Sequence, residues 1–395
     1  MLERLEPQSP DALLALIKLH AADERTDKVD LGVGVYRTGQ GGTPVFGAIK
    51  AAERNLVETQ ESKSYLGPEG DMGFVNALMP YIFGEDATMG GRISGMQTPG
   101  GTGAVRLALA LAQQAGLTKL HMGTPSWPNH AQIINDLGLA WEAFDHANAD
   151  GTANLEAVLD VINGAGPGEG VLLHGCCHNP TGIDYTQDQW EAIGDALASS
   201  GTFPIIDSAY QGLGHGMEED AAGMRSVLAK VPEAFIAYSC DKNFGMYRDR
   251  VGAFYIMAGT GPDGAATLEK AFSNANALAR ASWSMPPDHG AAAVRLILRD
   301  PEMTQQWLDE LDQMRTRMRQ VRDYLAKAGT AGSVDLTPLG TQNGLFSMLP
   351  VTKEQVVTLR EEHAIYMAGS GRINVAGLTM DNIDKFIGAI ADVTG

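Results

Sequence analysis

The sequence is poor in cysteine, in basic residues and in long apolar runs. Three cysteines occur among 395 residues, and two of them are adjacent (Cys176 and Cys177), which fits neither a disulfide framework nor a common zinc-ligand spacing. No segment approaches the ~20 apolar residues of a membrane span, and the N-terminus lacks an apolar signal segment. We therefore expect a cytoplasmic protein with no membrane partner and no metal site.

Lysines and arginines, 29 in all, are outnumbered by 48 aspartates and glutamates, giving a net charge of −19. Such an excess of negative charge disfavours nucleic acids and anionic membranes as partners, so any site for an anion must be local. Internal repeats and low-complexity segments are also absent. The 47 glycines cluster in short turns such as residues 100–103, which excludes a collagen-like chain.

From Gly100 onward, segments with helical and strand patterns alternate. This alternation is typical of an α/β fold with a mostly parallel sheet covered by helices on both faces. Ligands of such sheets bind at the carboxyl ends of the strands. The predicted helices are 102–115, 129–137, 154–162, 186–199 and 222–230, and the predicted strands are 118–122, 140–144, 171–176, 203–207, 234–239 and 251–258.

The flanking residues predict a smaller α+β unit. We expect a short strand at 31–36, a helix from 44 to 56 and a long, charged amphipathic segment at 301–328. The predicted domains are an N-terminal arm (1–10), a discontinuous small domain (11–40 and 301–395) and a large domain (41–300). The C-terminal strands are expected at 344–349, 365–367 and 373–375, and the C-terminal helices at 353–362 and 380–391.

Lys242 directly follows an apolar strand and lies near Ser239, Arg248 and Arg250 in the sequence. This position suits an amine that condenses with a carbonyl while its neighbours hold a phosphate. The glycines of residues 100–103 could support this by presenting backbone N–H groups at a helix N-terminus. A plain tight turn remains an alternative for these glycines, whereas a dinucleotide fingerprint would need glycine in place of Arg106.

Polar groups also follow other predicted strands. Asp207 comes after four apolar residues and is either a helix cap or a buried, paired carboxylate. His174 and Asn179 lie in a turn that could equally be structural, and Trp127 stands between two prolines where it could cover a planar ligand or pack in the core. Arginines such as Arg372 are more often surface residues than ligands.

Taken together, these motifs resemble the aspartate/aromatic amino-acid aminotransferases, which are pyridoxal-phosphate enzymes of fold type I. The resemblance implies a large domain with a mostly parallel seven-stranded sheet flanked by helices, plus a smaller α+β domain. The resemblance extends over essentially the whole chain, in order. It is carried by 65–67 (Tyr-Leu-Gly), 101–103 (Gly-Thr-Gly), 126–130 (Ser-Trp-Pro-Asn-His), 178–182 (His-Asn-Pro-Thr-Gly), 207–212, 239–250 and 371–374 (Gly-Arg-Ile-Asn).

The resemblance implies that Lys242 forms a Schiff base with pyridoxal 5′-phosphate and shuttles the substrate proton. It implies that Asp207 pairs with the ring nitrogen and that His130 and His174 hold Asp207. The other residues implied at the ring are Tyr210, Asn179 and Trp127.

The same resemblance implies a phosphate site made of Gly101, Thr102, Ser239 and Arg250, with Tyr65 contributed by a second subunit. Arg372 would bind the substrate α-carboxylate, assisted by Gly34, Asn179 and Trp127. Arg280, also from the second subunit, would bind a distal carboxylate. A homodimer with shared active sites is therefore expected.

Four residues depart from the family pattern. Asp241 replaces a small hydroxyl residue before the lysine. Either it turns away from the phosphate, toward Arg248, which is the outcome we favour, or the affinity for the cofactor is weakened. Gly100 stands where serine is frequent. Trp283 and Met285 make the surroundings of Arg280 more apolar, so we expect both dicarboxylic and aromatic substrates.

Transamination with 2-oxoglutarate or oxaloacetate is the function that these residues favour. A β-lyase or decarboxylase on the same fold is an alternative, although two arginines for two carboxylates favour dicarboxylate exchange. A non-catalytic protein that binds pyridoxal phosphate is the other alternative, although it would have no need of Lys242.

Overall fold

The computed structural model describes residues 1–7, 12–86 and 88–395. The chain divides into two compact units, Met1–Thr43 with Arg317–Gly395, and Pro44–Thr316. The predicted domain boundaries at 40/41 and 300/301 stay a prediction, and part of the predicted arm, residues 8–10, lies outside the described residues. Within the described ranges, no helix combines the length and the apolar character that crossing a membrane requires.

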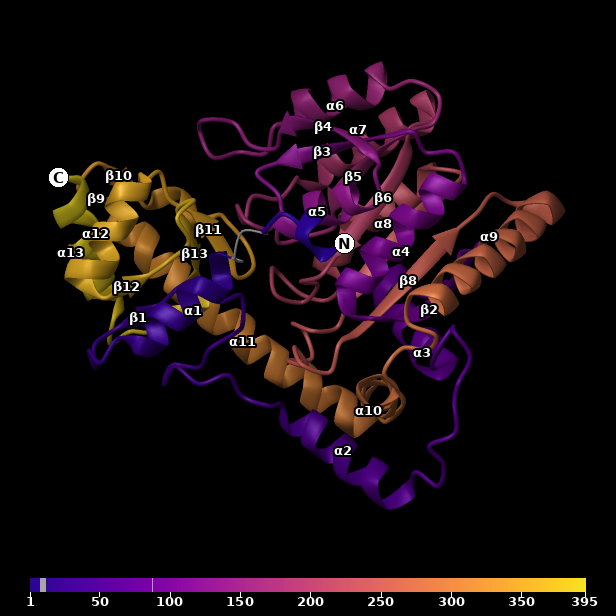
Figure 1. Ribbon diagram of the computed structural model, residues 1–395, viewed down its shortest axis with the longest axis horizontal. Coiled ribbons are helices and arrows are strands. Elements are labelled where there is room, and N and C mark those ends of the chain that lie inside the picture. Colours follow the sequence, from indigo (N-terminus) through magenta and orange to yellow (C-terminus); the bar gives the residue numbers. More distant parts are fainter. Residues whose placement is uncertain (8–11, 87) are drawn as a thin grey trace. The chain divides into compact units, whose positions relative to one another are not determined.

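The larger unit contains a sheet whose seven strands, counted over the described residues, run in the order β2-β8-β7-β6-β5-β3-β4 (Figure 1). Strand β8 is antiparallel to both of its neighbours, and the other pairs are parallel. The predicted α/β class with a mostly parallel sheet is confirmed. The strands are β2 (Ile93–Pro99), β3 (Lys119–Thr124), β4 (Ala140–Asp145), β5 (Glu169–His174), β6 (Phe203–Ser208), β7 (Ala234–Ser239) and β8 (Val251–Met257).

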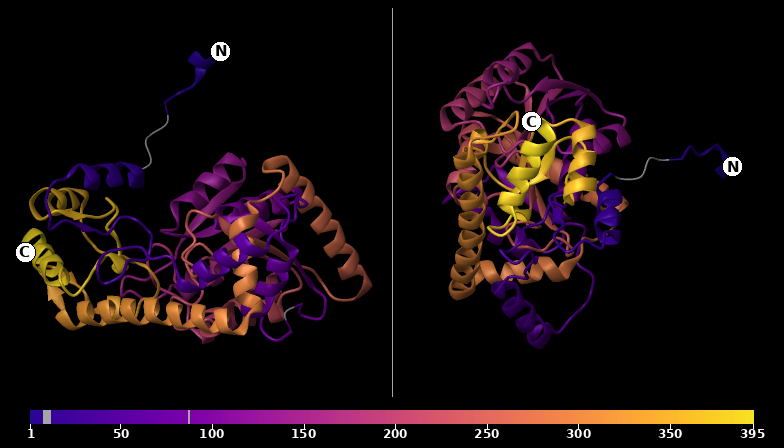
Figure 2. Two further views of the ribbon diagram at one scale, coloured as in Figure 1. Left: turned by 90° about the horizontal axis from the view of Figure 1, so that it is seen from below. Right: turned by 90° about the vertical axis from the view of Figure 1, so that its left-hand side faces the viewer.

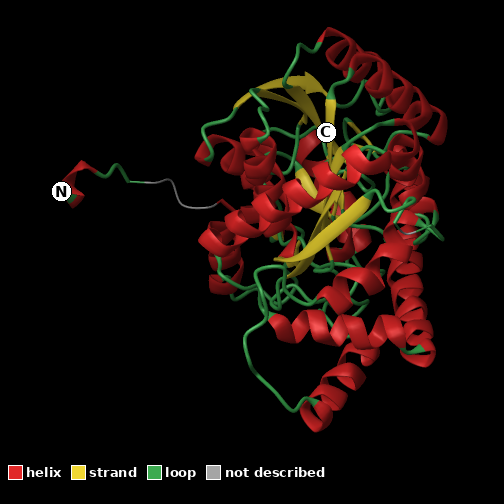
Figure 3. Ribbon diagram, turned by 90° about the vertical axis from the view of Figure 1, so that its right-hand side faces the viewer, coloured by secondary structure: helices red, strands yellow, loops and turns green. Residues whose placement is uncertain are grey.

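Helices cover both faces of this sheet (Figure 3). Every residue of β7 and β8 is buried, as expected for strands covered on both sides. Side chains of α4, α5 and α9 share one hydrophobic core with the sheet. The helices are α2 (Gly47–Thr59), α3 (Met72–Phe83), α4 (Gly100–Gln114), α5 (Pro128–Asp136), α6 (Leu155–Gly164), α7 (Gln187–Ser200), α8 (Glu219–Lys230), α9 (Gly261–Ser282), α10 (Asp288–Arg299) and α11 (Pro301–Ala328), which continues into the smaller unit.

The smaller unit is α+β and has a hydrophobic core of its own. Strand β1 pairs in parallel with β12, and β11 pairs antiparallel with β13. Helices α12 and α13 lie side by side (Figure 2). The elements are η1 (Leu2–Arg4), α1 (Ala12–Ala22), β1 (Val29–Asp30), β9 (Thr330–Ala331), β10 (Val334–Asp335), η2 (Thr337–Gly340), β11 (Phe346–Met348), α12 (Lys353–His363), β12 (Ile365–Tyr366), β13 (Arg372–Asn374), η3 (Val375–Gly377) and α13 (Ile383–Thr394).

The predicted strand at 31–36 is wrong, because β1 ends at Asp30. The carbonyls of Val33 and Val35 accept hydrogen bonds from the Asn374 side chain at 2.6 and 2.7 Å, so a side-chain amide takes the place of a neighbouring strand. The prediction also named no element between 57 and 99 or between 259 and 300, where the structure has β2, α3, α9 and α10.

Candidate active site

A cavity of about 180 Å³ lies at one edge of the large sheet. It collects ten of the predicted site residues, and Cys176, Ala209 and Asp241 also line it. The predicted residues that line it are Gly101, Thr102, Trp127, His174, Asn179, Asp207, Tyr210, Ser239, Lys242 and Arg250.

The strand directions explain this convergence. Strands β2, β3, β5, β6 and β7 all end at this edge. Strand β8, which runs the other way, begins there, directly after Arg250. Residues up to 150 positions apart in the sequence are therefore brought to one place.

Asp207, at the end of β6, is held by a chain of hydrogen bonds. The Asn179 N–H donates to Nδ1 of His174 (3.2 Å), so the ring proton of neutral His174 is on Nε2 and donates to Ser126 Oγ (3.2 Å). Ser126 then donates to Nδ1 of His130 (3.0 Å), and His130 Nε2 donates to Asp207 Oδ2 (2.8 Å). The predicted pair His130 and His174 is thus connected through Ser126, to which the sequence reasoning gave no role.

Behind Asp207, the histidines are enclosed and uncharged. Burial lowers the pKa of His174 and of His178 well below the ordinary value, and that of His146 is lowered for the same reason. The rings of His146 and His178 stack with centroids 3.6 Å apart, and His174 stacks on His178 at 4.1 Å. Uncharged rings can stack this closely without repulsion between like charges.

Two acceptor atoms in the cavity are buried and receive no hydrogen bond from the described residues: Asp207 Oδ1 and Asn179 Oδ1. Buried polar atoms are nearly always hydrogen-bonded, so these two mark where a ligand with donor groups fits. A protonated ring nitrogen suits Asp207 Oδ1, since a carboxylate pairs strongly with a charged donor. Asn179 Nδ2 also donates to the Tyr210 hydroxyl (3.3 Å). The residues present therefore fit pyridoxal phosphate.

Lys242 lines the cavity, and its Nζ lies 5.5 Å from the centre of the Tyr210 ring. Burial lowers the pKa of its amine, although the charges of Asp241 and Asp207 act in the opposite direction. A lowered pKa increases the fraction of neutral amine, which is the form that attacks a carbonyl or accepts a proton.

The N-terminus of α4 forms the other end of the cavity. Gly100 has φ +70°, and a Cβ on Gly101 would come within 2.9 Å of the Ser239 Cβ, so both positions require glycine. The backbone of α4 thereby approaches Ser239 closely, and its first N–H groups, with the Thr102 hydroxyl beside them, form a site suited to an anion.

Asp241 differs from the prediction made for it. Its side chain is 2% exposed and forms an ion pair with Arg250, not with Arg248. Its Oδ1 also accepts the Val251 N–H at 3.2 Å. Because β8 begins at Val251, pairing of β7 with β8 places Arg250 beside Asp241, whereas Arg248 is exposed in the connecting turn.

Tyr65 and Arg280 do not line the cavity. The Tyr65 residue is 94% exposed, and Arg280, in the last turn of α9, is exposed and donates to the Ser284 hydroxyl. The segments that carry them meet, because the Leu66 N–H contacts the Met285 sulfur at 3.0 Å. Both residues are therefore presented on one exposed region of the larger unit.

Arg372 and Gly34 belong to the smaller unit. The Arg372 guanidinium lies 4.6 Å from the centre of the Phe346 ring and donates to the Gly32 carbonyl (2.9 Å). A Cβ on Gly34 would come within 2.8 Å of the same ring. Phe346 thus connects the two residues predicted to bind the substrate carboxylate.

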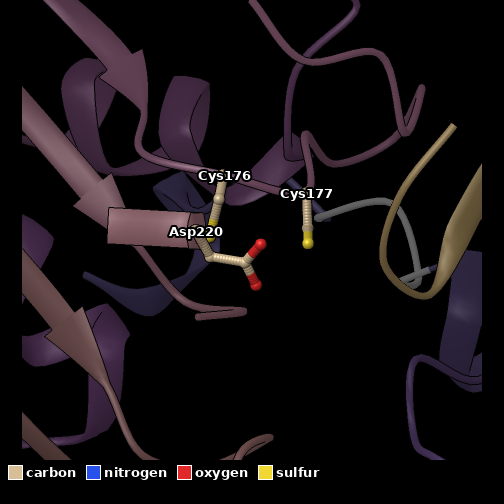
Figure 4. Close-up of side chains that lie close together, drawn as sticks. All are labelled: Cys176, Cys177 and Asp220. Carbon is tan, nitrogen blue, oxygen red and sulfur yellow. The ribbon is translucent and has the colours of Figure 1, made fainter. Parts of the chain in front are cut away.

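Cys176, Cys177 and Asp220 lie close together (Figure 4), with their potential metal-binding atoms within 4.8 Å of one another. The carboxylate is already engaged, because it accepts the N–H groups of Gly212, Gly214 and His215 at 2.8 to 2.9 Å. The hydrogen bond that the Cys177 thiol donates to Cys176, together with burial, raises the pKa of that thiol, which disfavours the thiolate that a metal needs. This cluster anchors the loop after β6.

Comparisons with known proteins agree with the chemistry of the cavity. The family model described as "Aminotransferase class I and II" matches residues 26–390. A tyrosine aminotransferase of Rhizobium meliloti (strain 1021) is 46% identical over 96% of each chain, and an aspartate aminotransferase of Escherichia coli (strain K12) is 39% identical over 100% of each. An aromatic-amino-acid aminotransferase of Burkholderia pseudomallei, solved covalently bound to pyridoxal phosphate, superposes with a TM-score of 0.94 at 34% identity, with 100% of both chains covered.

Proposed function

The chain belongs to the class I and II aminotransferases and is a pyridoxal-phosphate-dependent amino-acid aminotransferase, and we propose that it accepts both dicarboxylic and aromatic amino acids, with 2-oxoglutarate as the amino acceptor. The observation that carries this proposal is the cavity in which Lys242, Asp207 and Arg250 face one space. The relatives named for tyrosine and for aspartate support both substrate classes and favour transamination over a lyase or a decarboxylase.

When bound, pyridoxal phosphate supplies an electron-withdrawing ring that makes the substrate Cα–H acidic. Lys242 Nζ would hold the cofactor until the substrate amine displaces it, and the freed amine then takes the Cα proton and returns it. Its lowered pKa supports this role, because the neutral amine is the base. Asp207 Oδ1 binds the ring nitrogen and keeps it protonated, and the hydrogen bond from His130 orients the carboxylate for this task.

The remaining groups in the cavity position the cofactor. Asn179 and Tyr210 bind the phenolic oxygen of the cofactor. Trp127, whose ring centre lies 5.0 Å from that of His130, covers one face of the cofactor ring. Gly101, Thr102, Ser239 and Arg250 bind the phosphate. The glycine turn at the N-terminus of α4 supports this assignment, because backbone N–H groups there favour an anion.

Substrate recognition uses arginines. Arg372, with Gly34 beside it, binds the α-carboxylate, and Arg280 binds the distal carboxylate of aspartate or glutamate. Trp283 and Met285, near Arg280 in the sequence, provide apolar surface for aromatic side chains. Because Tyr65 and Arg280 are exposed and do not line the cavity of their own chain, we propose that they complete the site of a partner in a homodimer.

The three cysteines are unpaired, and all are buried. Thiols of this kind are compatible with the reducing conditions of the cytoplasm, which is the location we propose.

A substrate panel tests the proposed specificity. The holoenzyme is mixed with aspartate, glutamate, phenylalanine, tyrosine or tryptophan, and loss of the visible absorbance band of the bound cofactor is followed. We expect the band to disappear with members of both classes. A response to only one class would contradict the dual specificity, and a protein that binds no pyridoxal phosphate would contradict the function itself.

Arg280→Ala tests the distal clamp. We expect kcat/KM for aspartate to fall by about 10²-fold, in the range of a lost charged hydrogen bond, and kcat/KM for phenylalanine to change little. Arg106→Ala, which removes an exposed arginine paired with Asp136, is the control and should change neither value. Equal losses for aspartate and phenylalanine in Arg280→Ala would show that Arg280 does not bind the distal carboxylate.

A further inference from the structure

Asp241 is a carboxylate in a place that an anion is expected to occupy. It lines the cavity together with Gly101, Thr102, Ser239 and Arg250, the four residues proposed to bind the phosphate. A Cβ on Gly100 would come within 2.6 Å of Arg250 Nη2 and 3.1 Å of Asp241 Oδ2. The ion pair between Asp241 and Arg250 therefore lies against the glycine turn that opens α4.

Both oxygens of this carboxylate are engaged. Oδ2 accepts from Arg250 Nη1, and Oδ1 accepts from the Val251 N–H. The Asp241 N–H donates to Ser239 Oγ at 3.2 Å, which leaves the hydroxyl proton of Ser239 available for an anion. Arg250 also donates to the Tyr247 carbonyl at 3.1 Å. A phosphate that binds Arg250 therefore competes with Asp241 for the guanidinium.

The charges around Asp241 do not favour two anions at this place. Lys242 and Arg250, on the same turn, favour the ionised carboxylate, while Asp207 at the end of β6 adds a negative charge that acts on Lys242. The neighbouring Cys240 thiol is buried, and both burial and Asp241 raise its pKa. Residues 101 and 102 of α4 contribute no titratable side chain. Burial raises the pKa of Asp241 despite both cations.

We propose that Asp241 couples cofactor binding to proton uptake: the phosphate dianion takes over Arg250, and Asp241 accepts one proton from solvent on Oδ2. The ion pair between Asp241 and Arg250 is replaced by one between the phosphate and Arg250, and the neutral carboxyl can donate its O–H to a phosphate oxygen. The cofactor is then bound more tightly at low pH than at high pH. This inference rests on the proposed phosphate site.

Calorimetry on the full chain freed of cofactor tests the proposal. Pyridoxamine 5′-phosphate is the probe, because it carries the phosphate but no aldehyde to react with Lys242. Titrations in two buffers of different ionisation enthalpy give the number of protons taken up. The variant is Asp241→Asn, which keeps the size of the side chain and an acceptor for the Val251 N–H. Asp249→Asn removes a carboxylate from the same turn and is the charge control.

At pH 8.5 we expect the wild-type protein and Asp249→Asn to take up nearly one proton more per site than Asp241→Asn. We also expect Asp241→Asn to bind the probe at least tenfold more tightly than wild type at pH 8.5, with a smaller difference at pH 6. Equal proton numbers, or weaker binding by Asp241→Asn at every pH, would overturn the proposal and leave Asp241 as a residue that only positions Arg250.

Asp241→Ser provides a second variant, with melting temperature as the check that both variants fold. It should share the loss of proton uptake, and normal uptake in a folded Asp241→Ser protein would contradict the proposal. If neither wild type nor variant binds the probe at any pH, the phosphate site of the proposed function fails, which is distinct from binding without proton linkage.

Discussion

Asp207 and Asp241 are two buried carboxylates at the ends of neighbouring strands, yet they are held in opposite ways. Asp207 is bound on one oxygen by His130, the last member of the hydrogen-bond chain through Ser126, and its Oδ1 receives nothing from the described residues. Asp241 has both oxygens engaged, one of them by the cation Arg250. The first carboxylate has one oxygen open to a ligand, whereas both oxygens of the second already have partners within the protein.

This contrast shows that burial and residue type do not determine what a carboxylate does in a site. The Asp207 side chain leaves Oδ1 open to a ligand because His130 binds only Oδ2. The charge of Asp241 is balanced within the protein.

Replacing Lys242, the amine that both carboxylates act on, should have the largest effect. We expect Lys242→Ala to lower kcat by about 10⁴-fold, the upper range for a lost general base, as measured by steady-state assays. Lys242→Arg keeps a cation between Asp207 and Asp241 and should lose activity equally. Activity retained by the arginine variant would mean that only the charge at this position matters.

Asp207→Asn tests the part of the cavity that we propose binds the ring nitrogen of the cofactor. We expect kcat to fall by about 10²–10³-fold, similar to the loss of one preorganised electrostatic contact, because an amide cannot keep the ring nitrogen protonated. At saturating cofactor the loss should be at least tenfold larger than that of Asp241→Asn. Similar losses for the two variants would remove the distinction between the carboxylates.

Ser126→Ala interrupts the hydrogen-bond chain without touching Asp207. Loss of one buried hydrogen bond, about 1 kcal/mol, predicts a fall in kcat of about five- to tenfold with KM unchanged. Ser126→Thr retains the hydroxyl and should restore most of the activity. A change in KM alone, or no rescue by threonine, would show that Ser126 has only a packing role.

The uncharged histidines predict how stability depends on pH. The pKa values of His146, His174 and His178 are lowered in the folded protein, so below the ordinary value of 6.5 the unfolded chain binds more protons than the folded one. Their contribution to stability is therefore complete above about pH 6.5 and is lost as the pH falls below it. Each histidine contributes at most about 1.4 kcal/mol per pH unit.

Urea unfolding between pH 5 and 7.5 measures this slope. His178→Phe keeps a flat ring in the stack and removes one titrating group. The slope of its unfolding free energy against pH should therefore be smaller by the equivalent of nearly one proton. An unchanged slope in a folded His178→Phe protein would mean that His178 is charged in the native state, contrary to the uncharged stack of histidines behind Asp207.

Much of the fold was predictable, because alternating patterns report burial on strands and helices. Strands β3 to β8 and helix α11 were anticipated close to their observed positions. Strand β2 was not, since its antiparallel pairing with β8 depends on a contact between residues more than 150 positions apart. The predicted strand at 31–36 failed because the Asn374 amide takes its hydrogen bonds, a long-range effect that no local pattern carries.

For the site, the residue types were predictable and their partners were not. Asp207 stood out as an acid after an apolar run, and Lys242 as an amine in a similar position. Ser126 carried no signal of its own, since its role comes from lying between two histidines 44 positions apart in the sequence. The partner of Asp241 required the register of β7 against β8, which puts Arg250, and not Arg248, within reach.

The antiparallel strand β8 also bears on how the site assembles during folding. Asp241, Lys242 and Arg250 all lie in the connection between β7 and β8, so a single hairpin brings them together with little loss of chain entropy. Asp207 itself is on β6, and the hydrogen-bond chain that holds it uses Ser126 after β3, His130 on α5 and His174 at the end of β5, so its assembly closes loops of tens of residues. We therefore expect Lys242 and Arg250 to come together early in folding. The part of the cavity around Asp207 should become ordered only when the parallel strands associate.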